Sequence, residues 1–172
     1  PQKHQTLYDY FLHHLQNNVE LSSCGHPVAE PFIAGGYPVQ YFERNRFGLH
    51  PENAPPANVL LSRLCIDLTA ARVFPRIEAF QSVPDHAYFP ETGHSLNYAF
   101  LSYWQKNGGL SVFGYPISEE ISERSANDGK NYTIQYFERA RFEYHPEYKG
   151  TSAEVMLGLL GIKGMQTKGW QQ

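Results

Sequence analysis

Two sets of acidic and imidazole side chains, repeated at the same spacing, are the residues best suited to chemistry. The first set is Glu43, His50 and Glu52, and the same residue types recur 95 positions later. A carboxylate beside an imidazole can act as a general acid or base. Taken alone, these sets would support a hydrolase that uses a Glu/His pair.

A structural role explains both sets better, because each set also contains two arginines and neither comes with a nucleophile, metal or cofactor motif. Such charges are expected to form a network of ion pairs that fixes a hairpin. We therefore predict that the chain is not an enzyme and needs no cofactor. The predicted hairpin network consists of Glu43, Arg44, Arg46, His50, Glu52, Glu138, Arg139, Arg141, His145 and Glu147.

Two other groups of residues invite a binding role. His13 and His14 are adjacent, and neighbours on a helix point about 100° apart, so we predict no shared metal ion. Aromatic residues that alternate along a hairpin favour core packing, whereas an outward-facing subset could stack on sugar rings. The aromatic series is Tyr41, Phe42, Phe47, Tyr136, Phe137, Phe142 and Tyr144.

An internal repeat places these residues. Residues 11–30 align without a gap on 100–119 with nine of 20 identical, and residues 37–52 align on 132–147 with 11 of 16 identical. Two such blocks in the same order indicate a tandem duplication. We predict repeat one over residues 1–65, a connecting segment over 66–93, and repeat two with a C-terminal tail over 94–172.

Each repeat is expected to open with an amphipathic helix. Apolar residues follow a hydroxyl cap at i, i+4 and i+8 after Thr6 and after Ser95, and Asn107 and two glycines end the second of these helices. A Gly-x-Pro turn begins at Gly25 in repeat one and at Gly114 in repeat two. The alternating residues of 37–52 and 132–147 then predict a β-hairpin.

A short second helix is expected to close each repeat, over residues 59–64 and 155–160. In repeat two, Thr151-x-x-Glu154 has the pattern of a capping box. Residues 120–131 of repeat two are predicted to be a surface loop, residues 66–74 one more helical piece, and residues 84–90 extended. The fold class is therefore α+β, with two pseudo-equivalent repeats.

Charge and hydropathy exclude two classes of partner. The net charge of −3 gives no basic surface for a nucleic acid. No apolar run approaches the roughly 20 residues that cross a bilayer, so we predict no membrane span.

The two cysteines, Cys24 and Cys65, could form a disulfide or remain two buried thiols, and the sequence leaves both states open. Their counterparts follow the first helix and end the second, so we expect them close enough to bridge in an oxidising compartment.

Repeat two also resembles a known family. Its order of residues resembles the LGFP repeat of exported bacterial cell-envelope proteins, which reads W, GG, LGYP, E, DG, F and GAxxV. Residues 89–94, 113–118 and 135–146 are similar to a related extracellular bacterial repeat. Repeat one departs from the pattern at Val19, Glu20, Cys24 and His26. The residues that carry the resemblance are Trp104, Gly108, Gly109, Phe113, Gly114, Tyr115, Pro116, Glu119, Asp128, Gly129, Phe137 and Gly150 to Val155.

The resemblance implies a non-catalytic α+β domain in the cell envelope or outside the cell, often taken to associate with wall polymers. Two functions follow. The chain could be a self-assembling surface subunit, filamentous if its contacts are head to tail, or a monomeric module that binds cell wall or glycan. We favour assembly, because the chain is two modules without an attached enzyme. Tyr8, Tyr10 and Trp170 are the candidate assembly contacts.

Overall fold

A computed structural model describes residues 9–11, 13, 17, 24–55, 57–125 and 128–167. The predicted helix after Thr6 lies mostly outside these residues. The chain forms two compact units. Unit 1 combines residues 1–64 with residues 159–172, and unit 2 is residues 65–158. The connecting segment thus belongs to unit 2, and the C-terminal tail, which we placed with repeat two, belongs to unit 1.

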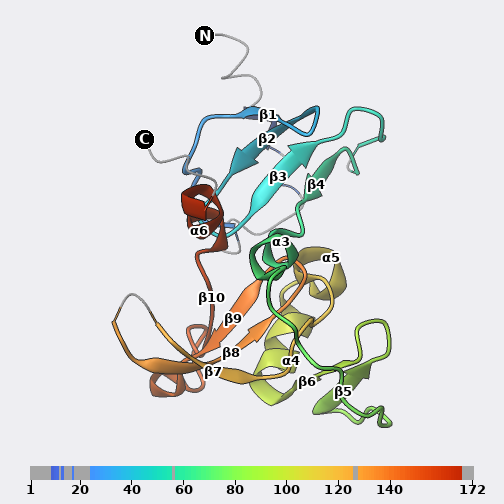
Figure 1. The fold of residues 1–172 in the computed structure, drawn as a ribbon, viewed down its shortest axis with the longest axis vertical. Helices are drawn as coiled ribbons and strands as arrows, with labels where there is room; N and C mark the ends of the chain where they lie inside the picture. The colour runs from blue at the N-terminus through green and yellow to red at the C-terminus, as the bar shows by residue number, and fades with distance from the viewer. Residues whose placement is uncertain are drawn as a thin grey trace. The chain divides into compact units, whose positions relative to one another are not determined.

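Unit 1 is a four-stranded antiparallel sheet in the order β1 (Phe32–Ala34), β2 (Tyr37–Tyr41), β3 (Arg46–Leu49) and β4 (Val59–Leu61) (Figure 1). Helix α6 (Leu160–Thr167) packs against β2. The core of the unit contains Phe11, Cys24, Phe42, Phe47 and Val59. Helix α3 (Leu64–Thr69) follows β4 and carries the chain into unit 2.

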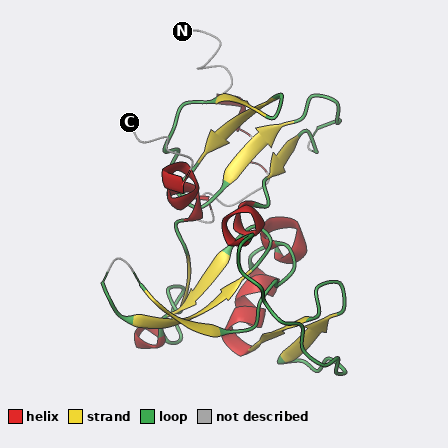
Figure 2. Ribbon diagram, in the orientation of Figure 1, coloured by secondary structure: helices red, strands yellow, loops and turns green. Residues whose placement is uncertain are grey.

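Unit 2 contains a sheet of the same strand order: β7 (Ile121–Arg124), β8 (Asn131–Tyr136), β9 (Arg141–Tyr144) and β10 (Val155–Leu157). It also has a two-stranded sheet of β5 (His86–Phe89) and β6 (His94–Asn97), visible in Figure 2. Helix α4 (Tyr98–Lys106) packs on β6, β9 and β10, and α5 (Gly109–Phe113) follows it. A 3-10 turn, η1 (Pro146–Tyr148), follows β9.

The fold is a mixture of helices and antiparallel sheets, in agreement with the α+β prediction. The two predicted hairpins are present as β2–β3 and β8–β9, and both have the same register. Gln40 pairs with Phe47, and Gln135 pairs with Phe142. The bridges at the Gly-x-Pro turns also correspond, because Pro27 pairs with Phe42 and Pro116 with Phe137.

The opening helix of the second half begins later than its sequence pattern predicts. Ser95 was expected to cap the helix, but it lies in β6 and pairs with Tyr88. Its backbone N–H and hydroxyl both donate to Glu119, and these bonds keep the residue in the strand. The helix therefore starts at Tyr98 after Asn97, and it ends at Asn107 as predicted.

The predicted second helices are wrong over most of their length. Residues 59–61 and 155–157 are strands that pair with β3 and β9, and the helices begin only at Leu64 and Leu160. The supposed capping box is a turn: Glu154 accepts from the N–H of Gly150, and Thr151 accepts from the N–H of Ala153. The predicted loop 120–131 is likewise a strand, β7, over its first part.

Both cysteines are buried free thiols, so the structure does not contain the expected disulfide. Cys24 belongs to the core of unit 1, where its sulfur accepts from Nδ2 of Asn45 at 3.7 Å, and Cys65 lies at the start of unit 2. Cys24 is thus accommodated by packing within unit 1. Among the helices of the described residues, none has the length and apolar character of a membrane span.

Candidate functional site

The turn end of each hairpin, where its two strands are connected, is bound to the Gly-x-Pro turn. Oε2 of Glu43 accepts from the backbone N–H of His26 at 3.1 Å, and Oε2 of Glu138 accepts from that of Tyr115 at 3.2 Å. Arg44 and Arg139 lie beside the respective carboxylates at 4.0 and 3.9 Å. These acidic groups thus hold the turns in place.

Both turns require glycine. Gly25 and Gly114 have φ angles of 74° and 77°, which L side chains rarely adopt. A Cβ at either position would also overlap the side chain of Glu43 or Glu138. The glycine and the glutamate of each half therefore form one close-packed contact.

The open end of each hairpin, opposite the turn, holds the imidazole. Nδ1 of His50 lies 3.0 Å from Glu52, and Nδ1 of His145 lies 3.2 Å from Glu147. Backbone hydrogen bonding, opposed by partial desolvation and supported by the histidine, lowers the pKa of both Glu52 and Glu147.

The structure does not assemble the acid–base set that the sequence allowed. Glu43 and His50 lie at opposite ends of β3, and Glu138 and His145 at opposite ends of β9. Four strand residues span about 13 Å, too far for one proton relay. The imidazole rings instead lie on tyrosine rings of the neighbouring strand.

The second arginine of each set contacts a buried tyrosine. Arg46 lies over the Tyr41 ring with its guanidinium 5.7 Å from the centroid, and Arg141 lies over the Tyr136 ring at 5.9 Å. Arg46 also donates to the Ser62 hydroxyl at 2.8 Å. These arginines therefore pack on the rings of the neighbouring strand.

In unit 2 this contact grows into a larger charge cluster. Arg141 pairs with Glu143 and with Glu123, and Arg72 donates to Glu123 at 2.5 Å and to the Tyr136 hydroxyl at 3.0 Å. Burial of Glu123 opposes its ionisation, but the hydrogen bonds from Arg72 and Tyr136 prevail and lower its pKa. The cluster joins residues from three separate segments of unit 2.

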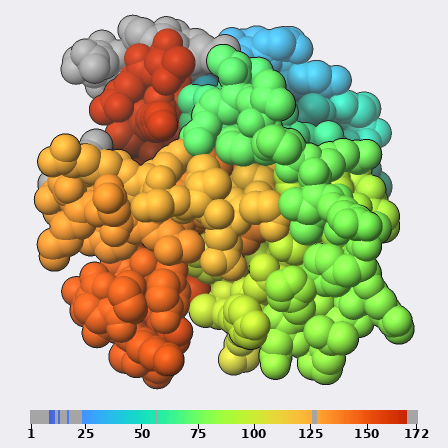
Figure 3. Space-filling model, turned by 60° about the horizontal axis from the view of Figure 1, so that its bottom comes forward, coloured from blue at the N-terminus to red at the C-terminus, as the bar shows by residue number. Residues whose placement is uncertain are grey.

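A second polar cluster, which the sequence did not reveal as a cluster, joins His94 and Ser95 to Glu119. Nδ1 of His94 lies 3.1 Å from Oε1 of Glu119, and the Ser95 hydroxyl donates to Oε2 at 2.5 Å. Since the serine donates to the carboxylate rather than to the imidazole, it is not activated as a nucleophile. In Figure 3 the green segment containing β5 and β6 lies beside the golden segment containing β7, the two parts of the chain that this cluster connects.

The aromatic series divides into core and surface. Six of its seven members are at most 3% exposed, so they pack the interior and cannot meet a ligand. Tyr144 is the exception, because it is half-buried and lines a hollow of about 440 Å³ at the open end of the β8–β9 hairpin. The six core members are Tyr41, Phe42, Phe47, Tyr136, Phe137 and Phe142.

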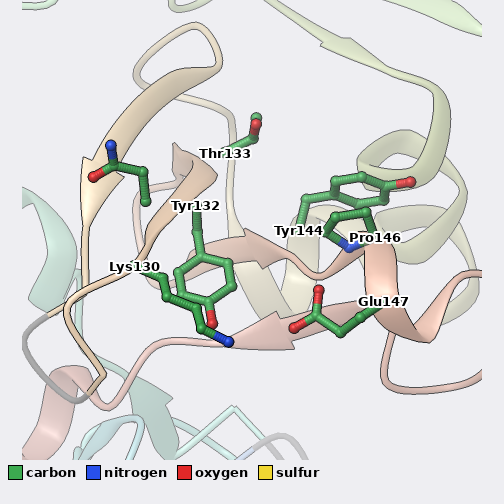
Figure 4. Close-up of a pocket in the computed structure, with 7 residues that line it drawn as sticks. Lys130, Tyr132, Thr133, Tyr144, Pro146 and Glu147 are labelled. Atoms are coloured by element: carbon green, nitrogen blue, oxygen red, sulfur yellow. The ribbon is translucent and has the colours of Figure 1, made fainter.

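This hollow, which we call the tyrosine pocket, combines aromatic faces with polar groups. In Figure 4, Tyr132 lies in the middle of the lining residues, with Lys130 near its ring and Tyr144 and Glu147 to the other side. The Tyr132 hydroxyl donates to Asp128 at 2.5 Å. That bond, together with desolvation, raises the pKa of Tyr132 to about 12. The full lining is Lys130, Asn131, Tyr132, Thr133, Tyr144, Pro146 and Glu147.

The corresponding end of the β2–β3 hairpin lacks most of these groups. Tyr37 and His50 keep the ring contact of Tyr132 and His145. However, Leu49 aligns with Tyr144, and a glycine aligns with Lys130. Sequence comparison of the two halves could therefore have indicated that the two hairpins differ at this end.

The remaining predicted contacts are only partly described. The Tyr10 hydroxyl accepts from Nδ2 of Asn58 within unit 1, and its side chain stays exposed. Tyr8, His14 and Trp170 lie outside the described residues. His13 contacts Asn17, and no cluster of three potential metal ligands occurs in the part of the chain that the structure covers.

Comparison with protein-family models gave no match, and comparison with curated proteins gave none.

Proposed function

We propose that the chain is an exported, non-catalytic bacterial protein made of two copies of one module, with a glycan-binding site on the second copy. Support for the duplication comes from contacts that recur in both halves: the hairpin register, the glutamate on the turn, and the tyrosine on the histidine. The resemblance of repeat two to envelope repeats supports export.

The absence of catalysis is supported by the use made of the candidate groups. Glu43 and Glu138 hold turns, and His50 and His145 lie on aromatic rings away from those carboxylates. The Ser95 hydroxyl, which lies beside the His94–Glu119 pair, already donates to the carboxylate. Each group therefore has a stabilising partner that a reaction would have to displace.

The tyrosine pocket carries the binding proposal. A sugar ring presents C–H groups on its faces and hydroxyls at its edge, and aromatic side chains surrounded by polar groups match both. Tyr132 and Tyr144 supply the aromatic surface, while Lys130, Asn131 and Glu147 supply donors and acceptors for hydroxyls. A neutral phenol at Tyr132, held by Asp128, keeps the ring in a fixed position.

The test is binding of the purified chain to isolated bacterial cell wall and to a soluble N-acetylglucosamine tetramer. Tyr144→Ala removes an aromatic wall and should weaken binding about tenfold, the loss of a stacking contact of about 1.4 kcal/mol. Leu49→Ala, at the position of unit 1 that aligns with Tyr144, is the matched control and should bind as the parent does. Equal binding by both variants, with both folded, would exclude the pocket as the site.

A further inference from the structure

Unit 1 is completed by a helix that arrives from the far end of the chain. The N–H groups of Gly161 and Ile162, at the start of α6, donate to the carbonyl of Glu43 at 3.0 and 3.3 Å. A Cβ at Gly161 would overlap the carbonyl oxygen of Phe42, so the helix backbone lies directly on the end of β2. The first 64 residues thus lack one of their packing partners until α6 docks.

The face of α6 that packs against β2 is buried and admits only small side chains at its two glycine positions. Leu160, Gly161 and Gly164 are buried, and a Cβ at Gly164 would lie 3.2 Å from the Tyr41 ring and 3.1 Å from Leu64. Two glycines one turn apart let the helix approach the sheet closely. Such an interface is specific, because any larger side chain at Gly161 would collide with the main chain at Phe42, just after β2.

The connection from unit 2 to α6 is short. The N–H of Gly158 donates to the carbonyl of Arg141 at 2.8 Å, which fixes it on the sheet of unit 2. The carbonyl of Leu159 already accepts from Lys163 at 3.1 Å within the helix. Residues 158–159 are therefore the whole hinge between the two units at this point.

The equivalent segment of repeat one also leaves its own sheet. Residues 59–76 align with 155–172, and Leu64 and Ile66 correspond to Leu160 and Ile162. After β4 the chain enters unit 2, where the Phe74 ring lies 5.5 Å from the ring of Tyr136. Tyr136 is the counterpart of Tyr41, against which Gly164 of α6 packs. In both cases, the segment that follows the fourth strand of one sheet packs against the second strand of the other sheet.

We infer that α6 is an exchangeable element, and that its partner is a second copy of this chain. When α6 leaves its own unit 1, the same glycines and hydrogen bonds fit the β2 end of unit 1 in another molecule. No new surface is needed, since the exchanged contact is the one already present in the single chain. Reciprocal exchange produces a closed dimer, and one-way exchange produces an open head-to-tail chain. This mechanism would deliver the self-assembly predicted from the sequence, and it does not depend on the glycan-binding proposal.

The test uses two full-length chains with different affinity tags, unfolded together in denaturant and refolded together without glycan. Capture on one tag, followed by light scattering of the eluted species, measures the fraction that contains both chains. We expect mixed species whose share rises with protein concentration during refolding. Deletion of Leu159 halves the hinge, disfavours closure within one chain, and should raise that share several-fold.

Gly161→Val blocks docking within and between chains, and should reduce mixed species to background. Lys163→Val is the matched control on the exposed face of the same helix and should behave as the parent. Because Gly161→Val also weakens unit 1, the Leu159 deletion provides the independent test, with circular dichroism confirming its fold. Absence of mixed species for both the parent and the Leu159 deletion, or their persistence in Gly161→Val, would overturn the proposal.

Discussion

The ring of Tyr132 lies on the imidazole of His145 with the two centroids 4.4 Å apart, and Tyr37 lies on His50 at 4.1 Å. In each hairpin the histidine that follows the second strand is thus covered by a tyrosine near the start of the first strand. The histidine also contacts the glutamate two residues after it in the sequence. This contact holds the open end of the hairpin together. Stability measurements on variants of the hairpin should therefore distinguish a structural role of these residues from a catalytic one.

His145→Ala should lower the free energy of unfolding by about 1–2 kcal/mol, because it removes a largely buried ring together with its hydrogen bond to Glu147. Glu138→Gln should also destabilise, by about 1 kcal/mol, because it weakens the bond to the N–H of Tyr115. Urea unfolding followed by circular dichroism measures both effects. Glycan or peptide turnover that either variant loses without a change in stability would instead show that these residues are catalytic.

The phenol of Tyr132 should titrate near pH 12, about two units above an ordinary tyrosine. Its hydrogen bond to Asp128 is the main cause, since ionisation would place two negative charges together. Asp128→Asn should therefore return the pKa toward 10. Nuclear magnetic resonance of ring-labelled tyrosine, assigned with Tyr132→Phe, would follow the titration, and an unchanged pKa in Asp128→Asn would contradict the assignment of cause.

The hairpins and the end of the first helix in unit 2 could be predicted from sequence, because alternation and a glycine after a helix are local signals. The predictions of secondary structure that were wrong failed because of long-range pairing. Residues 155–157 have an apolar run that suits a helix, but β9 offers an unpaired edge, so the run becomes a strand. Ser95 has the chemistry of a helix cap, yet Glu119, 24 residues away, holds it in β6.

The candidate site was predictable only in part. Repetition of the Glu, Arg and His set pointed to a structural network, because two catalytic copies would each need further groups. The pocket depends on Tyr132 and Lys130, which come into contact with the end of β9 through strand pairing. No spacing rule connects them with Glu147. The return of the C-terminal helix to unit 1 was equally invisible, since its docking signal is two glycines.

Neither cysteine should react with a thiol reagent in the native protein, and both should react after unfolding. Burial raises the pKa of Cys24 to about 11, so only about 0.1% of it would be thiolate at pH 8 even with access to solvent. Ellman's reagent added before and after denaturation, without reductant, measures the accessible thiols. Failure of both to react in the unfolded chain would show that the oxidised protein forms the Cys24–Cys65 disulfide.

Unit 2 should lose stability in acid as Glu123 becomes protonated. The folded pKa of this carboxyl lies below its ordinary value of 4.5, chiefly because the hydrogen bonds from Arg72 and Tyr136 outweigh its burial. The folded state therefore binds this proton more weakly than the unfolded chain does. Its contribution to stability is complete above about pH 5 and is lost as the pH falls through the lowered pKa.

Glu123→Gln removes this titration, so the difference in the free energy of unfolding between parent and variant should shrink as the pH falls from 6 to 3. Urea unfolding at half-unit pH steps gives that difference directly. Glu78→Gln, at an exposed position in the same unit, is the control and should leave the acid profile of the parent unchanged. A difference between the parent and Glu123→Gln that stays constant or widens toward pH 3 would show that the contact with Arg72 does not stabilise the ionised carboxylate.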